Sequence, residues 1–142
     1  MTASNTETAV TYTVLFVDDE PNILRAIKRA LFTMDINLLL ADSGAKALEL
    51  MQKQAVHVVI SDMKMPQMSG AELLEQVAKT YPETFRVVLT GYADIESTIK
   101  AVNQGTIHRY LQKPWDNQEL ISVINEGLER VKLKEENTRL QR

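Results

Sequence analysis

Five polar side chains that can bind a metal ion or a phosphoryl group stand at the ends of short apolar runs in this sequence. The runs are rich in β-branched residues, which is typical of strands that are buried on both faces of a parallel sheet. In such a sheet the carboxyl ends of the strands share one edge, where ligands bind. We therefore expect three carboxylates, one hydroxyl and one ammonium to meet in a single cleft: Asp18, Asp19, Asp62, Thr90 and Lys113.

The three carboxylates would repel one another if they ionised without a cation between them. A hard divalent ion relieves that repulsion, and Mg2+ prefers oxygen ligands while it keeps several waters. Mn2+ is the alternative ion. We assign direct ligation to Asp19 and Asp62, a water-mediated role to Asp18, and a further ligand to the backbone carbonyl of Lys64. The structural alternative, in which the aspartates only cap a helix and form a turn, leaves the matching strand ends unexplained.

The elements that must position these residues alternate between strand and helix along the chain. Pro21 fits the first turn of a helix, and Pro82 and Gly105 mark the ends of two others. The first helix carries an apolar stripe of Ile23, Leu24, Ile27, Leu31 and Phe32. We expect strands over 14–17, 37–41, 56–62, 86–90 and 109–112, and helices that begin near Pro21, Ser43, Ala71, Asp94 and Asp116 or Asn117. Such strand–helix units with right-handed crossovers predict an α/β fold with helices on both faces of a parallel sheet.

The composition is that of an ordinary globular protein and excludes several functional classes. The 142 residues are 44% hydrophobic and 25% charged, with a formal net charge of -3. That charge gives no basic footprint for nucleic acid, so we expect no direct nucleic-acid partner. The sequence has no cysteine, no apolar stretch long enough for a bilayer and no signal-peptide pattern at its start. We therefore expect no membrane partner and a cytoplasmic location.

Four motifs together resemble the receiver domain of two-component response regulators, in the right order and spacing from about Thr13 to Arg130. The resemblance implies a flavodoxin-like, doubly wound sheet of five parallel strands in the order 2-1-3-4-5, and a phosphoacceptor role for Asp62. It also implies a cis peptide before Pro114, a sensor histidine kinase or phosphotransfer protein as partner, and a regulatory domain rather than an enzyme. The motifs are Asp18-Asp19-Glu20-Pro21, Ser61-Asp62-Met63-Lys64-Met65-Pro66 with Ser69-Gly70, Leu89-Thr90-Gly91 and Gln112-Lys113-Pro114.

The remaining residues of the motifs receive roles in phosphoryl binding and switching. Attack by a carboxylate on an anionic phosphoryl group needs its charge neutralised, which Mg2+ and the Lys113 ammonium supply. The hydroxyl of Thr90 and the backbone N–H of Gly91 can then bind phosphoryl oxygens. The resemblance assigns Tyr110 a rotamer switch, in which its ring fills the space that the Thr90 hydroxyl vacates.

Two residues that flank the cleft are predicted to tune the lifetime of the acyl phosphate. Lys64 comes two residues after Asp62, and Tyr92 comes two residues after Thr90. We expect both side chains to control the access of water. Two segments, one around Tyr92 and one from Gln112 to Asp116, most resemble receivers that precede HD-type cyclic-di-GMP phosphodiesterases, related cyclic-dinucleotide enzymes or sensory kinases. A DNA-binding output domain is the alternative.

The last helix is longer than the domain requires. Leu133, Asn137 and Leu140 fit heptad positions d, a and d, and a polar residue at position a favours a defined register in dimers. We therefore expect a mobile tail over 1–11, a receiver domain over 12–130, and over 131–142 a helical extension that leads to an output domain or a homodimer partner. A solvated helix held by Glu–Lys and Glu–Arg pairs is the alternative.

Three other functional readings compete with the receiver. A haloacid-dehalogenase-like phosphohydrolase also places an aspartate after its first strand and uses Mg2+. The motif of that family is Asp-x-Asp, whereas this chain has Asp18-Asp19-Glu20-Pro21. A flavodoxin-like cofactor binder needs hydroxyls and backbone N–H groups for the flavin phosphate, and the first strand–helix loop here is acidic. A phosphorylation-independent interaction module has no positive support, because nothing in the expected cleft is missing.

Overall fold

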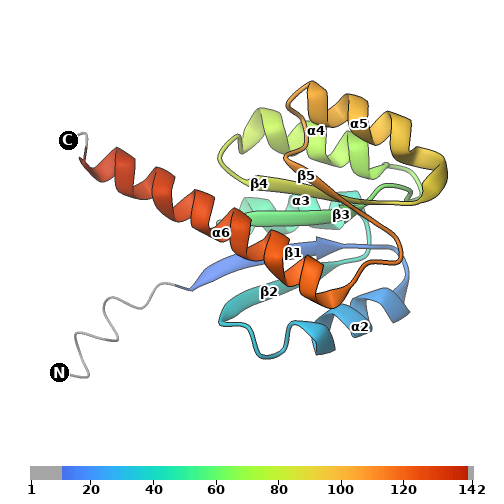
Figure 1. Ribbon diagram of the computed structural model, residues 1–142, viewed down its shortest axis with the longest axis horizontal. Coiled ribbons are helices and arrows are strands. Elements are labelled where there is room, and N and C mark those ends of the chain that lie inside the picture. Colours follow the sequence, from blue (N-terminus) through green and yellow to red (C-terminus); the bar gives the residue numbers. More distant parts are fainter. Residues whose placement is uncertain (1–10, 141–142) are drawn as a thin grey trace.

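The computed structural model describes residues 11–140 of the chain, apart from the side chains of Tyr92 and of residues 137–140 (Figure 1). Most of the expected tail over 1–11 therefore lies outside the described residues. The strands are β1 (Tyr12–Val17), β2 (Ile36–Ala41), β3 (Val58–Asp62), β4 (Phe85–Thr90) and β5 (Arg109–Gln112). The helices are α2 (Pro21–Ala30), α3 (Gly44–Lys53), α4 (Gly70–Thr80), α5 (Ile95–Asn103) and α6 (Asn117–Leu140), and the short 3-10 helix η1 (Tyr92–Asp94) precedes α5.

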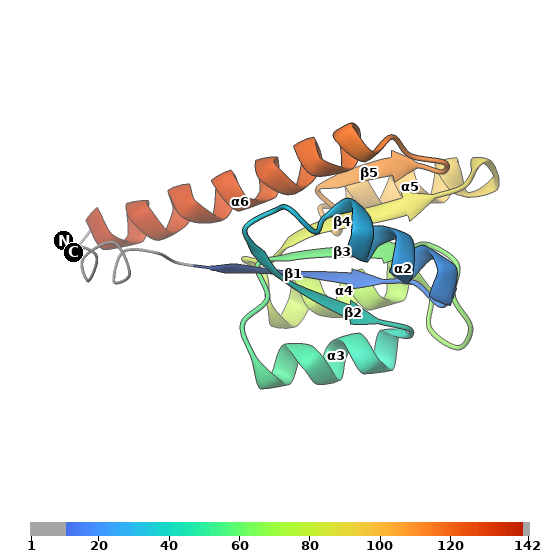
Figure 2. The same cartoon turned by 90° about the horizontal axis from the view of Figure 1, so that it is seen from below.

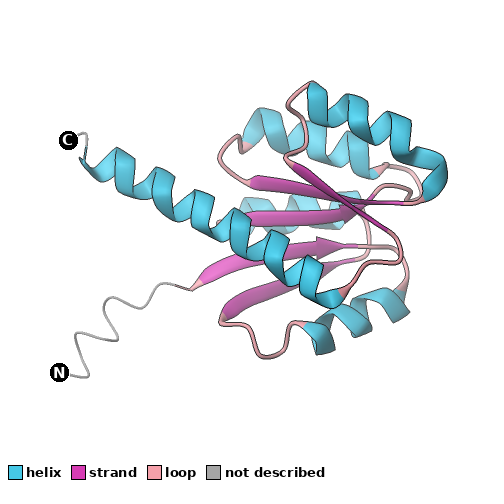
Figure 3. Cartoon of the chain, in the orientation of Figure 1, coloured by secondary structure: helices cyan, strands magenta, loops and turns pink. Residues whose placement is uncertain are grey.

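The strands form one sheet, which confirms the predicted fold class and strand order. All neighbours pair in parallel in the order β2-β1-β3-β4-β5, and helices cover both faces (Figure 3). The register aligns the carboxyl ends of the strands. Val17 pairs with Ser61, so the residues that follow each of them, Asp18 and Asp62, lie at the same level. Thr90 pairs with Gln112, which places Lys113 directly beyond the end of β4.

Each face of the sheet has its own apolar core. On one face Phe16 and Ile60 pack against α2 and α6, through residues such as Ile27 and Ile124. On the other face alternating residues of the same strands, such as Val59, pack against α3 and α4, which lie across the sheet from α2 and α6 (Figure 2). Because both faces are covered, β1, β3 and β4 are buried along almost their whole length, and this explains their unbroken apolar runs.

The helix boundaries follow the local signals in the sequence. Pro21 occupies the first turn of α2, and the hydroxyl of Ser43 caps α3. At the start of α4, Ser69 and Glu72 form a capping box, in which each side chain accepts from the other residue's backbone N–H. Gly105, at φ 81°, follows α5 in the left-handed conformation that favours glycine.

One part of the predicted core is wrong. The ring of Phe32, which was expected on the buried stripe of the first helix, is 82% exposed. The reason is that α2 ends at Ala30, so the chain turns before Phe32 and the helical spacing no longer applies. Among the described residues, no helix is both long and apolar enough to cross a membrane.

Candidate functional site

Three carboxylates converge at the carboxyl edge of the sheet, as the sequence predicts. Asp18 and Asp19 follow β1, and Asp62 is the last residue of β3. One oxygen from each carboxylate lies within 4.8 Å of the other two. Asp18 is fully buried and Asp62 is 8% exposed. Three anionic groups at this spacing repel one another unless a cation is bound among them.

The carboxylate of Asp18 has one satisfied and one unsatisfied oxygen. Oδ1 accepts a hydrogen bond of 2.9 Å from the backbone N–H of Glu20. Oδ2 is buried, and no described group donates a hydrogen bond to it. Burial raises the pKa of Asp18, and the charges of Asp62 and Asp19 add to this effect, while the Glu20 N–H and Lys113 oppose it. A buried carboxylate oxygen without a donor is costly, so the donor set of this cluster fits a hard divalent cation such as Mg2+.

Lys113 supplies the positive charge of the site. Its Nζ lies 2.8 Å from Asp62 Oδ1 and 3.6 Å from Asp18 Oδ2. The backbone N–H of Lys113 donates to the carbonyl of Thr90, which fixes the residue beyond the end of β4. Burial lowers the pKa of Lys113, but the hydrogen bond to Asp62 and the charges of Asp62, Asp18 and Glu20 outweigh it, so the net pKa is raised. The Lys113–Pro114 peptide is cis, as the resemblance implies.

The end of the loop after β3 packs closely against the backbone of Asp62. Gly70 donates its backbone N–H to the carbonyl of Met63 at 2.8 Å. A Cβ atom added at Gly70 would lie 2.1 Å from the backbone oxygen of Asp62. Glycine is therefore required at this position by close approach of the two backbones. The Ser69-Gly70 pair belongs to one of the receiver motifs, but this close approach was not predicted from the sequence.

Thr90 is fully buried, and both hydrogen-bonding functions of its hydroxyl are engaged. The hydroxyl donates to the carbonyl of Gly91 at 3.2 Å and accepts from the hydroxyl of Thr98 at 3.0 Å. A Cβ atom added at Gly91 would meet nothing within 4 Å, so the space beside this residue is open. The contact with Thr98, which lies in α5, was not predicted from the sequence.

Two other predicted residues, Lys64 and Tyr110, have partly or largely exposed side chains. The Lys64 side chain is 74% exposed, and its Nζ lies 3.7 Å from Asp94 Oδ1, so an ion pair joins the loops that follow β3 and β4. Tyr110 lies on β5 and is 40% exposed. The side chain of Tyr92 lies outside the described residues, and its predicted role therefore stays a prediction.

Both histidines lie at the amino ends of strands, on the edge opposite the acidic cluster. Nδ1 of His57 accepts from the backbone N–H of Thr13 at 2.9 Å, and Nδ1 of His108 accepts from that of Arg86 at 2.9 Å. An imidazole that accepts at Nδ1 is neutral. Burial, followed by the charge of Arg86, lowers the pKa of His108 to about 4. Both rings therefore have a structural role.

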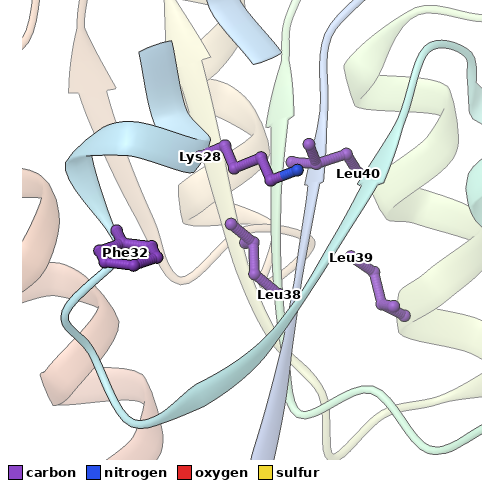
Figure 4. Close-up of a pocket in the computed structure, with 5 residues that line it drawn as sticks. All are labelled: Lys28, Phe32, Leu38, Leu39 and Leu40. Atoms are coloured by element: carbon purple, nitrogen blue, oxygen red, sulfur yellow. The ribbon is translucent and has the colours of Figure 1, made fainter. Parts of the chain in front are cut away.

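A hollow on another part of the surface is separate from the acidic cluster. It has a volume of about 390 Å³ and lies between the end of α2 and the edge strand β2, lined by Lys28, Phe32, Leu38, Leu39 and Leu40 (Figure 4). None of the five carries a carboxylate, and only Lys28 is charged. The chemistry of the chain is therefore concentrated at the sheet edge rather than in this hollow.

The comparison with known proteins agrees with the fold. The family model of the response regulator receiver domain matches residues 14–125. The chain therefore belongs to the receiver-domain family of two-component response regulators. This match does not support the haloacid-dehalogenase alternative.

Relatives with different outputs share this domain. A structure of an uncharacterised protein from Neptuniibacter caesariensis is 48% identical, with a TM-score of 0.87, and covers 92% of this chain and 97% of that chain. The signal receiver domain of an HD domain-containing protein from Pseudomonas fluorescens Pf-5 is 38% identical, with a TM-score of 0.81, and covers 86% and 98%. The hydrogenase transcriptional regulatory protein HoxA from Cupriavidus necator is 37% identical over 117 residues, which are 82% of this chain and 24% of HoxA. The chain thus spans about a quarter of the length of the curated relatives that it matches.

Proposed function

We propose that this receiver domain accepts a phosphoryl group on Asp62 from a sensor histidine kinase or a phosphotransfer protein. The observation that carries the proposal is the position of the Lys113 ammonium, 2.8 Å from Asp62 Oδ1 and beside the fully buried Asp18. A regulatory domain of this kind catalyses only its own phosphorylation and dephosphorylation. The proposal places it in the cytoplasm, the compartment of the kinase domains that would supply the phosphoryl group.

The chemistry follows from the groups at the sheet edge. A carboxylate oxygen of Asp62 forms a bond to phosphorus while the phosphorus–nitrogen bond of the donor breaks, and the electron pair of that bond returns to the imidazole. Lys113 offsets the charge that the phosphoryl oxygens bring into the cleft. Thr90 Oγ1 and the backbone N–H of Gly91 are the proposed donors to these oxygens. Gly91 leaves the approach open, because a Cβ at this position would meet nothing within 4 Å.

The acidic cluster is the proposed magnesium site, with Mn2+ as the alternative ion. Asp19, Asp62 and the backbone carbonyl of Lys64 would hold the ion directly, and Asp18 would hold it through water. The bound ion would neutralise negative charge on the carboxylates and on the incoming phosphoryl group. The support for this assignment is the buried Oδ2 of Asp18, which accepts no hydrogen bond from the described residues, together with the short spacing of the three carboxylates.

The proposed output route runs through Tyr110 and the last helix. On phosphorylation Thr90 turns toward the phosphoryl group, the ring of Tyr110 moves inward, and the face formed by α5, β5 and α6 changes. In Figure 1, α6 extends well beyond the sheet. We keep the proposed boundaries, a tail over 1–11, a receiver domain over 12–130 and an extension over 131–142 that leads to an output domain or a second copy.

The extension is attached to the amino-terminal edge of the sheet by polar contacts. The hydroxyl of Tyr12 donates to Glu135 at 3.2 Å, and Lys134 pairs with Glu83 at 2.8 Å. Leu133 is 56% exposed, which leaves an apolar side chain for a partner helix. The side chains of Asn137 and Leu140, the other two predicted heptad positions, lie outside the described residues.

The test is mass spectrometry of the protein after treatment with acetyl phosphate and Mg2+. We expect a single phosphoryl adduct at Asp62, which is lost in Asp62→Asn and retained in Asp42→Asn, an exposed aspartate outside the cluster. Rapid turnover of a phosphoester without a stable adduct would instead indicate a hydrolase. Absence of any adduct, with beryllofluoride also failing to bind, would indicate a phosphorylation-independent module and would refute the proposal.

A further inference from the structure

A buried hydrogen bond connects the proposed switch residue Thr90 to helix α5. The hydroxyl of Thr98 donates to Thr90 Oγ1 at 3.0 Å, and both residues have no exposed surface. Thr98 is the buried residue of α5, while the other residues of this helix are partly or fully exposed. The buried residue of α5 therefore carries a hydroxyl group, which needs a hydrogen-bond partner.

In the unphosphorylated structure the Thr90 hydroxyl makes its hydrogen bonds to Gly91 and Thr98, and none to the position that a phosphoryl group on Asp62 would occupy. A hydroxyl has one proton to donate, and the Thr90 proton is directed to the carbonyl of Gly91. To donate to a phosphoryl oxygen on Asp62, the Thr90 hydroxyl must leave that carbonyl. When it turns, its oxygen moves relative to Thr98 Oγ1, whose position is set by α5. The Thr98 donor then loses its acceptor, or α5 has to move with Thr90.

We propose that Thr98 is a positioning residue that holds Thr90 in the unphosphorylated arrangement and couples its movement to α5. The inference rests on the proposed phosphorylation of Asp62. In this view the Thr98–Thr90 hydrogen bond opposes phosphoryl capture, because a buried hydroxyl left without a partner raises the free energy of the captured state. The same bond makes α5 respond when Thr90 turns. Thr98 does not contact the phosphoryl group and acts only through Thr90.

The variant that tests the proposal is Thr98→Val, which keeps the shape of the side chain and removes the hydroxyl. Two effects then act in the same direction. In the free protein Thr90 Oγ1 loses its donor, and in the captured state no unsatisfied hydroxyl remains on α5. We expect beryllofluoride, which stands in for the phosphoryl group in the presence of Mg2+, to bind Thr98→Val about two- to tenfold more tightly than wild type, the range for one neutral hydrogen bond.

The measurement is a heteronuclear NMR titration with beryllofluoride at saturating Mg2+. Thr98→Ser retains a hydroxyl and should return the affinity toward the wild-type value. Ser97→Ala removes an exposed hydroxyl from the same helix and should have no effect. The amide shifts that beryllofluoride induces in residues 95–103 should be smaller in Thr98→Val than in wild type, because α5 is no longer connected to Thr90.

A second measurement needs neither Mg2+ nor a phosphoryl analogue. In the metal-free protein, amide hydrogen exchange in α5 should be faster in Thr98→Val than in wild type, while Thr98→Ser and Ser97→Ala should resemble wild type. If Thr98→Val does not fold, Thr98→Ala replaces it with the same expectations. Equal or weaker binding of beryllofluoride in the valine or alanine variant would overturn the inference. Failure of the wild type itself to bind beryllofluoride at Asp62 would refute the proposed function instead.

Discussion

The ammonium of Lys113 and the carboxylate of Asp62 form the shortest ion pair of the acidic cleft, with Nζ 2.8 Å from Oδ1. The same ammonium lies 3.6 Å from Asp18. The side chain of Lys113, which follows β5, thus offsets part of the charge of two carboxylates, one that follows β1 and one at the end of β3. The cleft therefore contains an internal cation that must share these carboxylates with any metal ion that binds.

The first prediction separates the two roles of Lys113. In Lys113→Met the rate of phosphorylation of Asp62 by acetyl phosphate should fall about 100-fold, as for removal of one preorganised donor. The affinity for Mg2+ should rise, because a competing positive charge has been removed. Magnesium titration, followed by the fluorescence of the nearby Trp115, and phosphorylation kinetics measure the two effects.

Lys79→Met, which removes an exposed charge from α4, is the matched control and should change neither quantity. A weaker affinity for Mg2+ in Lys113→Met would show that this ammonium organises the carboxylates instead of competing for them.

The second prediction concerns the pH dependence of stability. The folded state holds His108 neutral, with its pKa lowered from 6.5 to about 4, first by burial and then by Arg86. The unfolded chain takes up this proton near pH 6.5, so the free energy of unfolding should decrease as the pH falls from about 6.5 to about 4. Because His108 is only partly buried and solvent screens its neighbours, the loss over this window is on the order of 1–2 kcal/mol. Denaturant unfolding at several pH values measures it.

His108→Asn tests this most directly, because the amide oxygen of asparagine can accept the hydrogen bond from the backbone N–H of Arg86 but does not titrate. The decrease in stability between pH 6.5 and 4 should become shallower in this variant. His57→Asn makes the equivalent change at Thr13, where the pKa of His57 is also lowered by burial. An unchanged pH profile in both variants would mean that other groups control acid unfolding.

The third prediction compares two glycines near the cleft. In Gly70→Ala the new Cβ would lie 2.1 Å from the backbone oxygen of Asp62, so the β3–α4 loop must shift. We expect a loss of about 2–4 kcal/mol in the free energy of unfolding. Gly91→Ala adds the same atom where nothing lies within 4 Å, at φ -87°, and should change the stability by less than about 0.5 kcal/mol. Chemical denaturation measures both, and equal effects would contradict the close approach.

The fourth prediction concerns the ion pair between Lys64 and Asp94, which joins the loops that follow β3 and β4. Replacing Lys64 and Tyr92 should shorten the lifetime of the acyl phosphate, because both side chains are predicted to restrict water. We expect Lys64→Met alone to accelerate dephosphorylation about two- to fivefold, the range that an exposed ion pair supports. Asp94→Asn should have a similar effect.

The lifetime is measured from the decay of the phosphorylated protein after the phosphodonor is removed. Lys46→Met, which removes an exposed ion pair in α3, is the matched control. If the double variant of Lys64 and Tyr92 decays at the wild-type rate, neither residue tunes the lifetime.

Much of the fold follows from the sequence, because unbroken apolar runs occur where strands are covered on both faces. The positions of Asp18, Asp62 and Lys113 were predictable for the same reason, since each directly ends or follows such a run. The expected position of Phe32 was wrong because the periodicity does not show where a helix ends. The end of this helix depends on the contacts of the turn that follows it.

The connection between Thr98 and Thr90 was missed because it depends on how a helix lies on a strand, which local spacing does not determine. A usable signal was present. Thr98 stands three residues after Ile95 and four before Val102, so it occupies the apolar stripe of α5, where a hydroxyl requires a buried partner. Asp94 carries no such signal, because its partner Lys64 comes from another loop.

The last helix has a geometric consequence for whatever is joined to it. The residues that pack in the core, such as Leu120 and Ile124, and the residues that contact Tyr12 and Glu83 belong to one unbroken helix. Each residue of an α-helix is rotated by about 100° around the helix axis from the one before it. The number of helical residues after Val131 therefore sets the direction, around this axis, in which any segment joined to the helix would point. Adding a single residue there would rotate that segment by about 100° around the helix axis, whereas adding seven residues, about two turns, would return it close to its original direction.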